Sequence, residues 1–327
     1  MIGSAETDET PGERATLHVV RDVAGVARLV DYLKARLVAV PVTEIGDLIT
    51  TGRVRIAVGG HVARGRTIDV VADGDGILVD AAALGELERA SRWNPPWEHA
   101  VAVLHEDDDL VVVNKVAGMH VHPIGDKRTH TIVNALVARA GVRDDNPWGR
   151  WRPHVVQRLD FGVSGVLAVA KSAEAKAALV VEQKNGEVSR IYRANVAGRI
   201  AEAEGTIDAP VGRDPTQRGR RAVVAIENGR RAVTRWNVLE RFSDRTLVEL
   251  HPETGRTHQL RVHMAAIGHP IVGDVLYGGP ALPGAGVIAL HSTRLELRHP
   301  ATRDLLVFDA LPPPDFGLGS SASGELS

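Results

Sequence analysis

The sequence predicts an α+β protein in which one large domain follows a small N-terminal α/β module. Short runs rich in Val, Ile and Leu recur along the 327 residues, and residues typical of turns bound most of them. Such runs indicate β-strands. Helical spacing of apolar residues is confined to a few segments between the strands. Many short strands interrupted by few helices are typical of the α+β class.

Composition restricts the possible functions. The chain is 44% hydrophobic and 24% charged, as in ordinary soluble proteins. It contains no cysteine, which excludes disulfides, thiolate catalysis and cysteine-based metal sites. No apolar run approaches the roughly 20 residues of a membrane helix, and the acidic, polar segment 1–13 does not resemble a signal peptide. We therefore expect a cytoplasmic protein without a membrane partner.

The net charge of −2 conceals an uneven distribution. Residues 127–263 carry 24 Lys and Arg against 15 Asp and Glu, whereas the rest of the chain carries 15 against 26. A localised polyanion-binding face would produce this pattern, and so would simple solvated surface. Residues 211–231 are rich in Gly and Arg, which favours phosphate contacts. The arginines of this segment are Arg213, Arg218, Arg220, Arg221, Arg230 and Arg231.

The N-terminal region separates into a tail and a module. Residues 1–15 lack apolar periodicity and are expected to be disordered. In residues 16–80, helical spacing begins at Leu29 and again at Ile45. Strand-like runs follow at 52–56, 67–71 and 77–79. This order resembles the small RNA-binding module of ribosomal protein S4. Eight basic and eight acidic residues balance across residues 17–80, so RNA binding by this module stays open.

Residues 81–98 contain a Pro-Pro pair and are interpreted as a linker. The large domain then spans residues 99–314, and a Gly/Ser-rich flexible tail spans residues 315–327. Periodicity predicts helices in this domain over residues 129–140 and 173–183. Strands are predicted at residues 110–113, 166–170, 189–198, 233–239, 246–250, 287–297 and 305–308.

Residues 155–171 contain one carboxylate, Asp160, between an Arg-Leu pair and a turn of small residues. The apolar run after this turn predicts a buried strand. Asp160 is therefore expected on a loop at the edge of the core, where a carboxylate is costly unless it is paired or used. The alternative is that its side chain only organises the turn.

Residues 253–274 form a second dense motif. A threonine and a glycine near its start predict a helix that has Arg256, His258 and Gln259 in its first turn. A guanidinium can hold a carboxylate in a bidentate grip. An ionised, partly buried Asp160 would require such a partner.

Two histidine pairs could in principle bind a metal ion. His120 and His122 would share a face of an extended segment, but no third ligand has suitable spacing. His258 and His263 are five residues apart and do not share a helix face. The sequence therefore predicts no metal site.

Three stretches together, residues 107–123, 155–171 and 253–274, resemble the signature segments of the RluA-type pseudouridine synthases, in the family's order and spacing. The likeness extends over roughly residues 101–314. It implies isomerisation of specific uridines in structured RNA to pseudouridine, without cofactor or metal, on a nucleotide flipped out of its stack. It also implies a mixed, largely antiparallel sheet with a central active-site cleft. We expect a monomer that acts on RNA, with ribosomal RNA favoured over transfer RNA.

The resemblance also implies roles for individual residues. Asp160 would be the catalytic carboxylate, acting as a nucleophile or as a base toward the sugar. Arg256 would be its ion-pair partner, and Tyr192 would lie against the flipped base. Arg158 would occupy the gap left in the RNA. Further RNA contacts are expected from charge at Lys115, Arg190, Arg213, Arg218, Arg220 and Arg221, and loop support is expected from Gln157, Ser164 and Gly165.

The chain departs from the family pattern around Asp160. The family usually has His-Arg-Leu-Asp-x-x-Thr-Ser-Gly, whereas here Gln157 replaces the His and Val163 replaces the Thr. In addition, Val116 stands where Pro is usual, and Arg190 stands where Lys often precedes the tyrosine. Gln157 can still donate and accept hydrogen bonds, but the Val163 side chain cannot. Altered target choice or a reduced rate would originate in this loop.

Two other classes of function stay open. The departures motivate an RNA-binding or ribosome-assembly factor whose isomerase activity is weak or lost. A sugar hydrolase in which Asp160 attacks an anomeric carbon would need a second, proton-donating carboxylate, and Glu253 is the only nearby acid in a motif. Tritium release from uridine C5 separates the isomerase from an inactive binding factor.

Overall fold

The computed structural model describes residues 15–21, 23, 25–37, 40, 42–80, 96–123, 129–142, 150–284, 286–314 and 316. Most of the expected linker and most of both expected tails lie outside these residues. The chain divides into two compact units. The first comprises residues 1–99 and 123–153, and the second comprises residues 100–122 and 154–327. Segment 123–153, placed in the large domain by the sequence, thus groups with the N-terminal residues.

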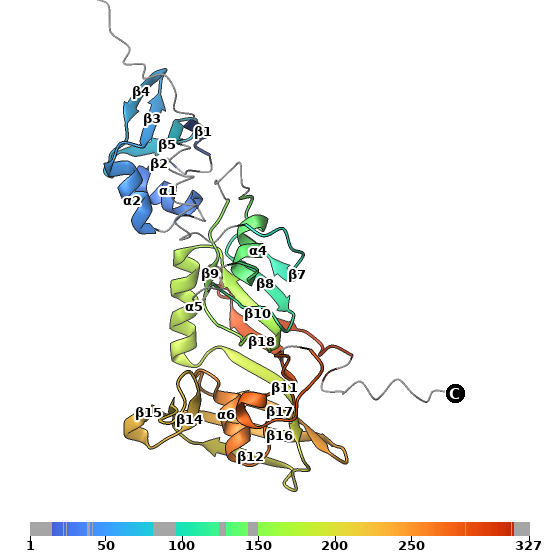
Figure 1. The fold of residues 1–327 in the computed structure, drawn as a ribbon. Coiled ribbons are helices and arrows are strands. Elements are labelled where there is room, and N and C mark those ends of the chain that lie inside the picture. The colour runs from blue at the N-terminus through green and yellow to red at the C-terminus, as the bar shows by residue number, and fades with distance from the viewer. Residues whose placement is uncertain are drawn as a thin grey trace, which may run out of the picture. The chain divides into compact units, whose positions relative to one another are not determined.

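The first unit contains a four-stranded antiparallel sheet in the order β1-β6-β3-β4, a two-stranded ribbon of β2 and β5, and short helices (Figure 1). Its strands are β1 (Ala15–Val19), β2 (Val26–Arg28), β3 (Val54–Val58), β4 (His61–Arg64), β5 (Val70–Ala72) and β6 (Gly76–Asp80). Its helices are α1 (Leu29–Arg36), α2 (Val42–Thr50) and α4 (Ile132–Arg139). Both helices predicted for the module are confirmed, and Leu29, Leu33 and Ile45 are fully buried in one core.

One predicted strand of this module starts later than expected. The run 67–71 becomes extended only at Val70, because the Asp69 carboxylate accepts the backbone N–H of Arg66 and closes a turn. Elsewhere in this unit, the guanidinium of Arg152 donates to the carbonyls of Lys34 and Leu37 at 3.2 and 2.6 Å. Arg152 thereby satisfies carbonyls at the C-terminal end of α1 that the helix itself leaves open.

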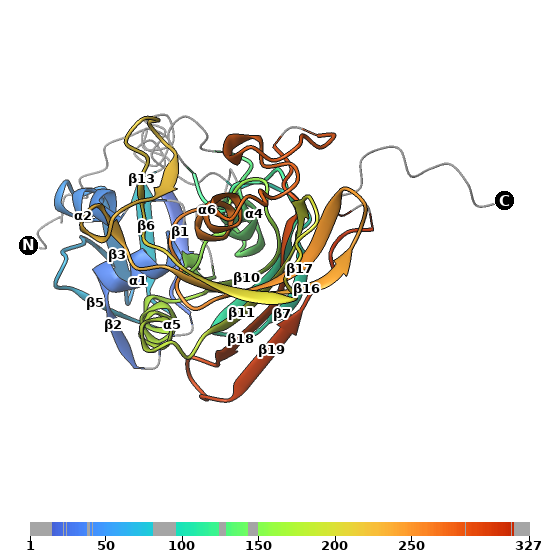
Figure 2. The same cartoon turned by 90° about the horizontal axis from the view of Figure 1, so that it is seen from below.

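The second unit is built on a ten-stranded sheet. Its main order is β12-β16-β17-β11-β18-β10-β8-β7, while β19 pairs with β18 and β9 pairs with β10. Every pair is antiparallel except β10 with β18, as the predicted mixed, largely antiparallel sheet requires. Figure 2 shows β11, β18 and β19 side by side. The strands are β7 (Ala102–Glu106), β8 (Leu110–Lys115), β9 (His154–Val155), β10 (Ser164–Ala170), β11 (Ser189–Ala197), β12 (Glu204–Asp208), β16 (Val233–Arg241), β17 (Arg245–Pro252), β18 (Leu290–Arg298) and β19 (Leu305–Asp309).

Helices and a small second sheet complete this unit. The helices are α5 (Ala173–Asn185), α6 (Gln259–Ala266) and the short η1 (Ile226–Asn228) and η2 (Val275–Tyr277). The small sheet has the order β14 (Arg221–Val223), β13 (Val211–Arg213), β15 (Gly229–Arg230). Helix α5 begins where the Ser172 hydroxyl accepts the N–H of Ala175, and ends at Gly186 in the left-handed conformation, as its Asn-Gly stop predicts. Among the described helices, none is long and apolar enough to cross a membrane.

Strand β10 is buried along its whole length, as the apolar run predicts. It meets β18 in parallel, with Gly165 opposite Ser292. Gly165 has φ +111°, and a Cβ there would lie 2.2 Å from the Ser292 carbonyl oxygen. Only glycine satisfies both conditions. This close approach brings the loop that precedes β10 against β18.

Helix α6 begins later than the sequence predicts. The Thr254 hydroxyl donates to the Gln259 side chain instead of capping a helix, and the helix begins at Gln259. His258, the residue before it, has the left-handed φ of +58°. Arg256 consequently lies before the helix, and Arg261 lies on its buried side.

Candidate active site

The loop before β10 presents Asp160 at the edge of the core, with 29% of its side chain exposed. A buried lysine, Lys115 at the end of β8, binds the backbone of this loop. Its Nζ donates to the carbonyls of Val116, Phe161 and Val163 at 2.9, 3.3 and 2.7 Å. Burial lowers the pKa of Lys115 to about 7, against the opposing influence of Asp160. Lys115 was expected to contact RNA, and this is wrong because its side chain is 1% exposed and satisfied by backbone.

The ion-pair partner of Asp160 is Arg261. Its Nη1 donates to Asp160 Oδ2 at 2.9 Å, while Nε and Nη2 make a bidentate pair with Asp274 at 2.7 and 2.8 Å. Burial alone would lower the pKa of Arg261, but Asp274 and Asp160 outweigh it and raise that pKa. Arg256 was expected in this role, and this is wrong. Arg256 is exposed, and its Nε donates to the carbonyl of Arg231 at 3.0 Å.

A second group approaches the same carboxylate oxygen. His258 Nε2 lies 3.7 Å from Asp160 Oδ2, and its Nδ1 lies 2.8 Å from the hydroxyl of Tyr277. That hydroxyl also accepts the backbone N–H of Arg221 at 3.0 Å. The guanidinium of Arg261 lies 5.0 Å from the centre of the Tyr277 ring. Tyr277 thus packs against Arg261 and contacts His258 at the same time.

Sheet order brings Tyr192 toward this site. Tyr192 lies on β11 opposite Ser292 of β18, and Ser292 lies opposite Gly165 of β10. Burial raises the pKa of Tyr192, the hydrogen bond with Ser292 and the charge of Arg190 oppose it, and the Asp160 charge adds to it. Tyr192 therefore stays protonated at neutral pH, within electrostatic range of Asp160. Through β18, these strand pairings link the segment of Tyr192 to the segment of Asp160, which are separate in the sequence.

The residues expected to support the loop have defined contacts. Gln157 accepts a hydrogen bond from Arg190 Nε at 3.0 Å, and Ser164 Oγ lies 2.8 Å from His291 Nδ1. Val163 is buried, its backbone N–H donates to the Asp160 carbonyl at 3.1 Å, and its carbonyl accepts from Lys115. Backbone atoms therefore hold the turn, and the hydroxyl that Val163 lacks is not needed for these bonds.

The remaining arginines differ in their surroundings. Arg158 is exposed beside the loop, with Nη2 3.5 Å from the Thr257 hydroxyl. Arg213 and Arg218 are exposed, while Arg220 pairs with Asp214 at 3.5 Å and lies over the Tyr277 ring. Arg221 is half-buried on β14, Arg230 is exposed on β15, and Arg231 pairs with Asp208 at 2.9 Å.

Comparison with known proteins gives the family. Residues 109–266 match the family model described as RNA pseudouridylate synthase. An uncharacterised RNA pseudouridine synthase of Bacillus subtilis is 44% identical over 217 residues, which cover 65% of this chain and 69% of that protein. Ribosomal large subunit pseudouridine synthase D of Pseudomonas aeruginosa is 38% identical over 275 residues, covering 80% and 82%. The chain belongs to the RluA-type RNA pseudouridine synthases.

A solved structure agrees with this family. Human RNA pseudouridylate synthase domain containing 1 is similar with a TM-score of 0.54 and 27% identity, covering 67% of this chain and 86% of that one. The synthase described here is therefore an isomerase of RNA uridines, as the resemblance of its motifs implied. The relation of its N-terminal module to the ribosomal protein S4 module stays a prediction.

Sequence reasoning missed Arg261, Asp274 and Tyr277 of the synthase. A signal was present, because Arg261 stands between the apolar residues Leu260 and Val262 in a helix whose residues 259–264 are all buried. An arginine among buried apolar residues requires carboxylate partners. Asp274, which follows the apolar pair 271–272, is 1% exposed and meets this requirement.

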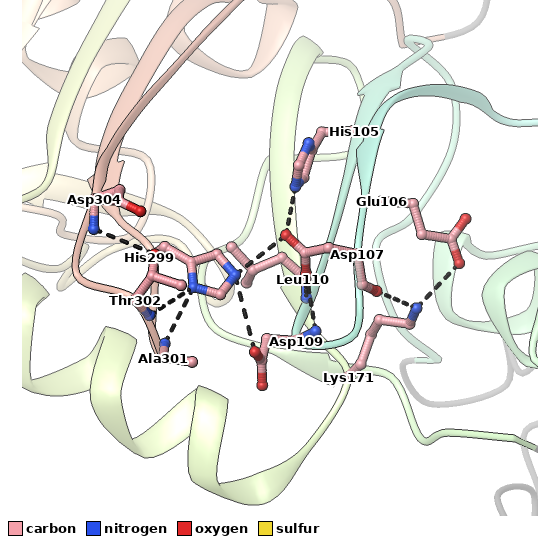
Figure 3. Close-up of polar contacts among 10 residues, drawn as sticks. All are labelled: His105, Glu106, Asp107, Asp109, Leu110, Lys171, His299, Ala301, Thr302 and Asp304. Atoms are coloured by element: carbon pink, nitrogen blue, oxygen red, sulfur yellow. Dashed lines mark hydrogen bonds and ion pairs between the residues drawn. The ribbon is translucent and has the colours of Figure 1, made fainter.

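A histidine–aspartate cluster lies elsewhere in this unit of the synthase (Figure 3). Asp107, Asp109 and His299 are close enough to share a metal ion, and His105 Nε2 lies 2.5 Å from Asp107 Oδ2. However, His299 Nδ1 accepts the backbone N–H groups of Ala301 and Thr302 at 3.2 and 3.0 Å. The ring proton must then be on Nε2, which faces Asp107 at 3.2 Å, so this nitrogen is a donor. The cluster joins two turns by hydrogen bonds and is poorly suited to a metal.

The histidines considered from sequence make separate contacts. His263 is bound between the Thr234 hydroxyl at 2.9 Å and the Ala209 carbonyl at 3.0 Å, away from the Asp160 contact of His258. The ring of His120 lies 4.7 Å from the ring of Phe161. Burial and the charge of Arg158 lower the pKa of His122. His122 is therefore largely neutral at pH 7, and the His120 ring packs against the Asp160 loop through Phe161.

Proposed function

We propose that the synthase isomerises uridines of large-subunit ribosomal RNA and that Asp160 is its reacting carboxylate. The observation that carries this proposal is the charge arrangement of Asp160, a partly exposed carboxylate bound by an arginine that Asp274 fixes from the other side. The target is taken from the relatives named ribosomal large subunit pseudouridine synthase D. Transfer RNA is the competing substrate.

The isomerisation has strict chemical requirements. The C1′–N1 bond breaks with its electron pair on N1, C5 of the rotated base bonds to C1′, the C5 proton leaves, and N1 gains a proton. Asp160 would form a bond to C1′ as the C1′–N1 bond breaks and release it when C5 attacks, or it would remove a sugar proton and later return it. Either role needs an ionised carboxylate. Arg261 binds this carboxylate at 2.9 Å with a guanidinium that remains charged throughout the physiological pH range.

Both contacts from Arg261 and His258 reach Oδ2 of Asp160. Within the described part of the chain, no residue donates a hydrogen bond to the other carboxylate oxygen of Asp160, Oδ1. We therefore assign Oδ1 to the sugar. Tyr192, half-buried beside this carboxylate, would stack on the flipped base, and exposed Arg158 would fill the vacated position in the RNA.

Tritium release tests this function. Large-subunit ribosomal RNA carrying tritium at uridine C5 is incubated with wild type and with Asp160→Asn, and transfer RNA serves as the competing substrate. We expect release from ribosomal RNA by wild type only. Release by both proteins would remove Asp160 from the reaction, and binding without release by wild type would favour the inactive assembly factor. Release confined to transfer RNA would overturn the proposed target.

A further inference from the structure

His258, the residue directly before α6, has an unusual backbone conformation. Its φ of +58° is in the left-handed region, which side chains other than Gly, Asn and Asp rarely adopt. A strained residue persists where its surroundings hold it, and such residues gather at functional sites. Here the backbone turn directs the imidazole between Asp160 and Tyr277.

The contacts of Tyr277 favour one tautomer of His258. The phenol oxygen accepts the N–H of Arg221, so its own hydrogen is available for His258 Nδ1 at 2.8 Å. This arrangement favours the tautomer with the ring proton on Nε2, which faces Asp160. With the opposite tautomer, a nitrogen lone pair would face the carboxylate oxygen 3.7 Å away, which is unfavourable.

We infer that His258 is a positioning residue for Asp160. Its Nε2–H, oriented by Tyr277, forms a second contact to Oδ2 and directs Oδ1 toward the ribose. This inference rests on Asp160 being the reacting carboxylate. The distance of 3.7 Å exceeds that of a hydrogen bond, and such contacts commonly shorten when substrate binds.

The charged groups around His258 give this contact a pH dependence. Burial lowers the pKa of His258, Asp160 and Asp274 oppose this shift, and Arg261 and Arg221 add to it. His258 is therefore neutral at pH 7. An imidazolium would bind Asp160 more strongly and weaken it as a nucleophile or base. Activity should rise with pH through the His258 pKa, below 6.5, and level off near neutrality.

Two substitutions separate the contacts of this ring. Asparagine tolerates the left-handed backbone and can still reach Tyr277, but it has no group at the position of Nε2. Glutamine offers an N–H near that position and cannot titrate. We expect His258→Asn to lower single-turnover kcat about 10- to 100-fold at every pH, with little change in KM for RNA. We expect His258→Gln to keep at least threefold more activity than His258→Asn and to lose the rising limb of the profile below pH 6.5.

The experiment measures tritium release against pH for wild type, both His258 variants, Tyr277→Phe, Asp160→Asn and a control, His269→Gln. His269 Nδ1 lies 2.9 Å from the Ala197 carbonyl, away from the Asp160 contacts, and its replacement should leave the profile unchanged. Tyr277→Phe should lower kcat less than His258→Asn, because the ring remains. If Asp160→Asn is inactive while His258→Asn matches wild type across pH, this inference is wrong. Activity in Asp160→Asn would instead overturn the role of Asp160 and this inference with it.

Discussion

Lys115 and Arg261 are both cations near Asp160, yet their surroundings give them different tasks. Lys115 is buried beneath the loop and donates to three backbone carbonyls. Arg261 reaches the carboxylate itself and is fixed by Asp274. The lysine therefore binds the backbone of the loop, and the arginine binds and orients its carboxylate.

Lys115→Met should destabilise the synthase by about 2–3 kcal/mol, because it leaves carbonyls of the loop without their donor. Lys176→Met on α5 is the matched control, since Lys176 is exposed, and it should change stability by less than about 0.5 kcal/mol. Chemical denaturation measures both. Equal stability of wild type and Lys115→Met would contradict the role given to this lysine.

The stability that depends on Lys115 should also vary with pH. Its pKa is about 7 in the folded protein and about 10.4 in an unfolded chain. Between these values the unfolded state binds more protons, so the stability of the folded state rises with pH. The advantage of wild type over Lys115→Met should be larger at pH 9 than at pH 6. The opposite trend in denaturation midpoints would show that Lys115 stays charged when buried.

At the scale of elements, most strands of the large sheet were predicted from sequence, whereas β7, β9, β12, the small sheet and the start of α6 were not. Strands β8 and β10 are nearly continuous apolar runs, which a doubly covered strand requires. The start of α6 depends on a bond between Thr254 and Gln259, and this bond competes with the capping role that threonine usually has. Because the helix starts a few residues later than predicted, Arg261 and not Arg256 is the ion-pair partner of Asp160. Periodicity cannot resolve such a change.

Gly165→Ala should test the approach of β10 to β18. A Cβ at this position meets the Ser292 backbone and a positive φ together, so we expect a loss of about 3 kcal/mol or more, with loss of activity. Gly186→Ala at the end of α5 has a positive φ but nothing within 4 Å, and should cost about 1 kcal/mol. Thermal unfolding compares the two, and similar losses would argue against the steric explanation.

Asp107→Asn should weaken the turn before β8. Burial alone would raise the pKa of Asp107, but hydrogen bonds from His105, Leu110 and Asp109 outweigh it and lower that pKa. Because the pKa of the Asp107 carboxyl is lower in the folded protein, this group stabilises the fold at pH values above its pKa in the unfolded chain. The stabilisation is lost as the pH falls through its pKa in the folded protein. We expect a loss of about 1–3 kcal/mol at pH 7, measured by urea denaturation, that shrinks below pH 4. A loss independent of pH would contradict this account.

At the scale of the whole molecule, net charge says little about the substrate. The chain as a whole is slightly acidic, whereas residues 127–263 have a clear basic excess. Within this excess, Arg231 pairs with Asp208 and Arg220 with Asp214, and Arg213 and Arg218 are exposed. Exposed arginines of this kind are the ones suited to phosphate contacts.

The double variant Arg213→Gln, Arg218→Gln should bind ribosomal RNA with a shallower salt dependence. Each lost phosphate contact lowers the slope of log K against log salt by about 0.7–0.9, so the expected change is about 1.5. Arg294→Gln is the control, because Arg294 pairs with Asp309 on β19. Filter binding across salt concentrations measures the slopes. An unchanged slope in the double variant would exclude these arginines from the RNA interface.

The central claim is that Asp160, paired with Arg261, performs the reaction. Single-turnover tritium release from ribosomal RNA labelled at uridine C5 tests it most directly, with Arg261→Met and Arg256→Met compared at equal folded concentration. We predict that Arg261→Met lowers the rate at least about 100-fold, because it removes a preorganised charge partner. Arg256→Met should stay within about threefold of wild type, because its side chain donates to the backbone carbonyl of Arg231 and its substitution leaves the Asp160–Arg261 pair in place. A large loss in Arg256→Met together with an active Arg261→Met would contradict the account.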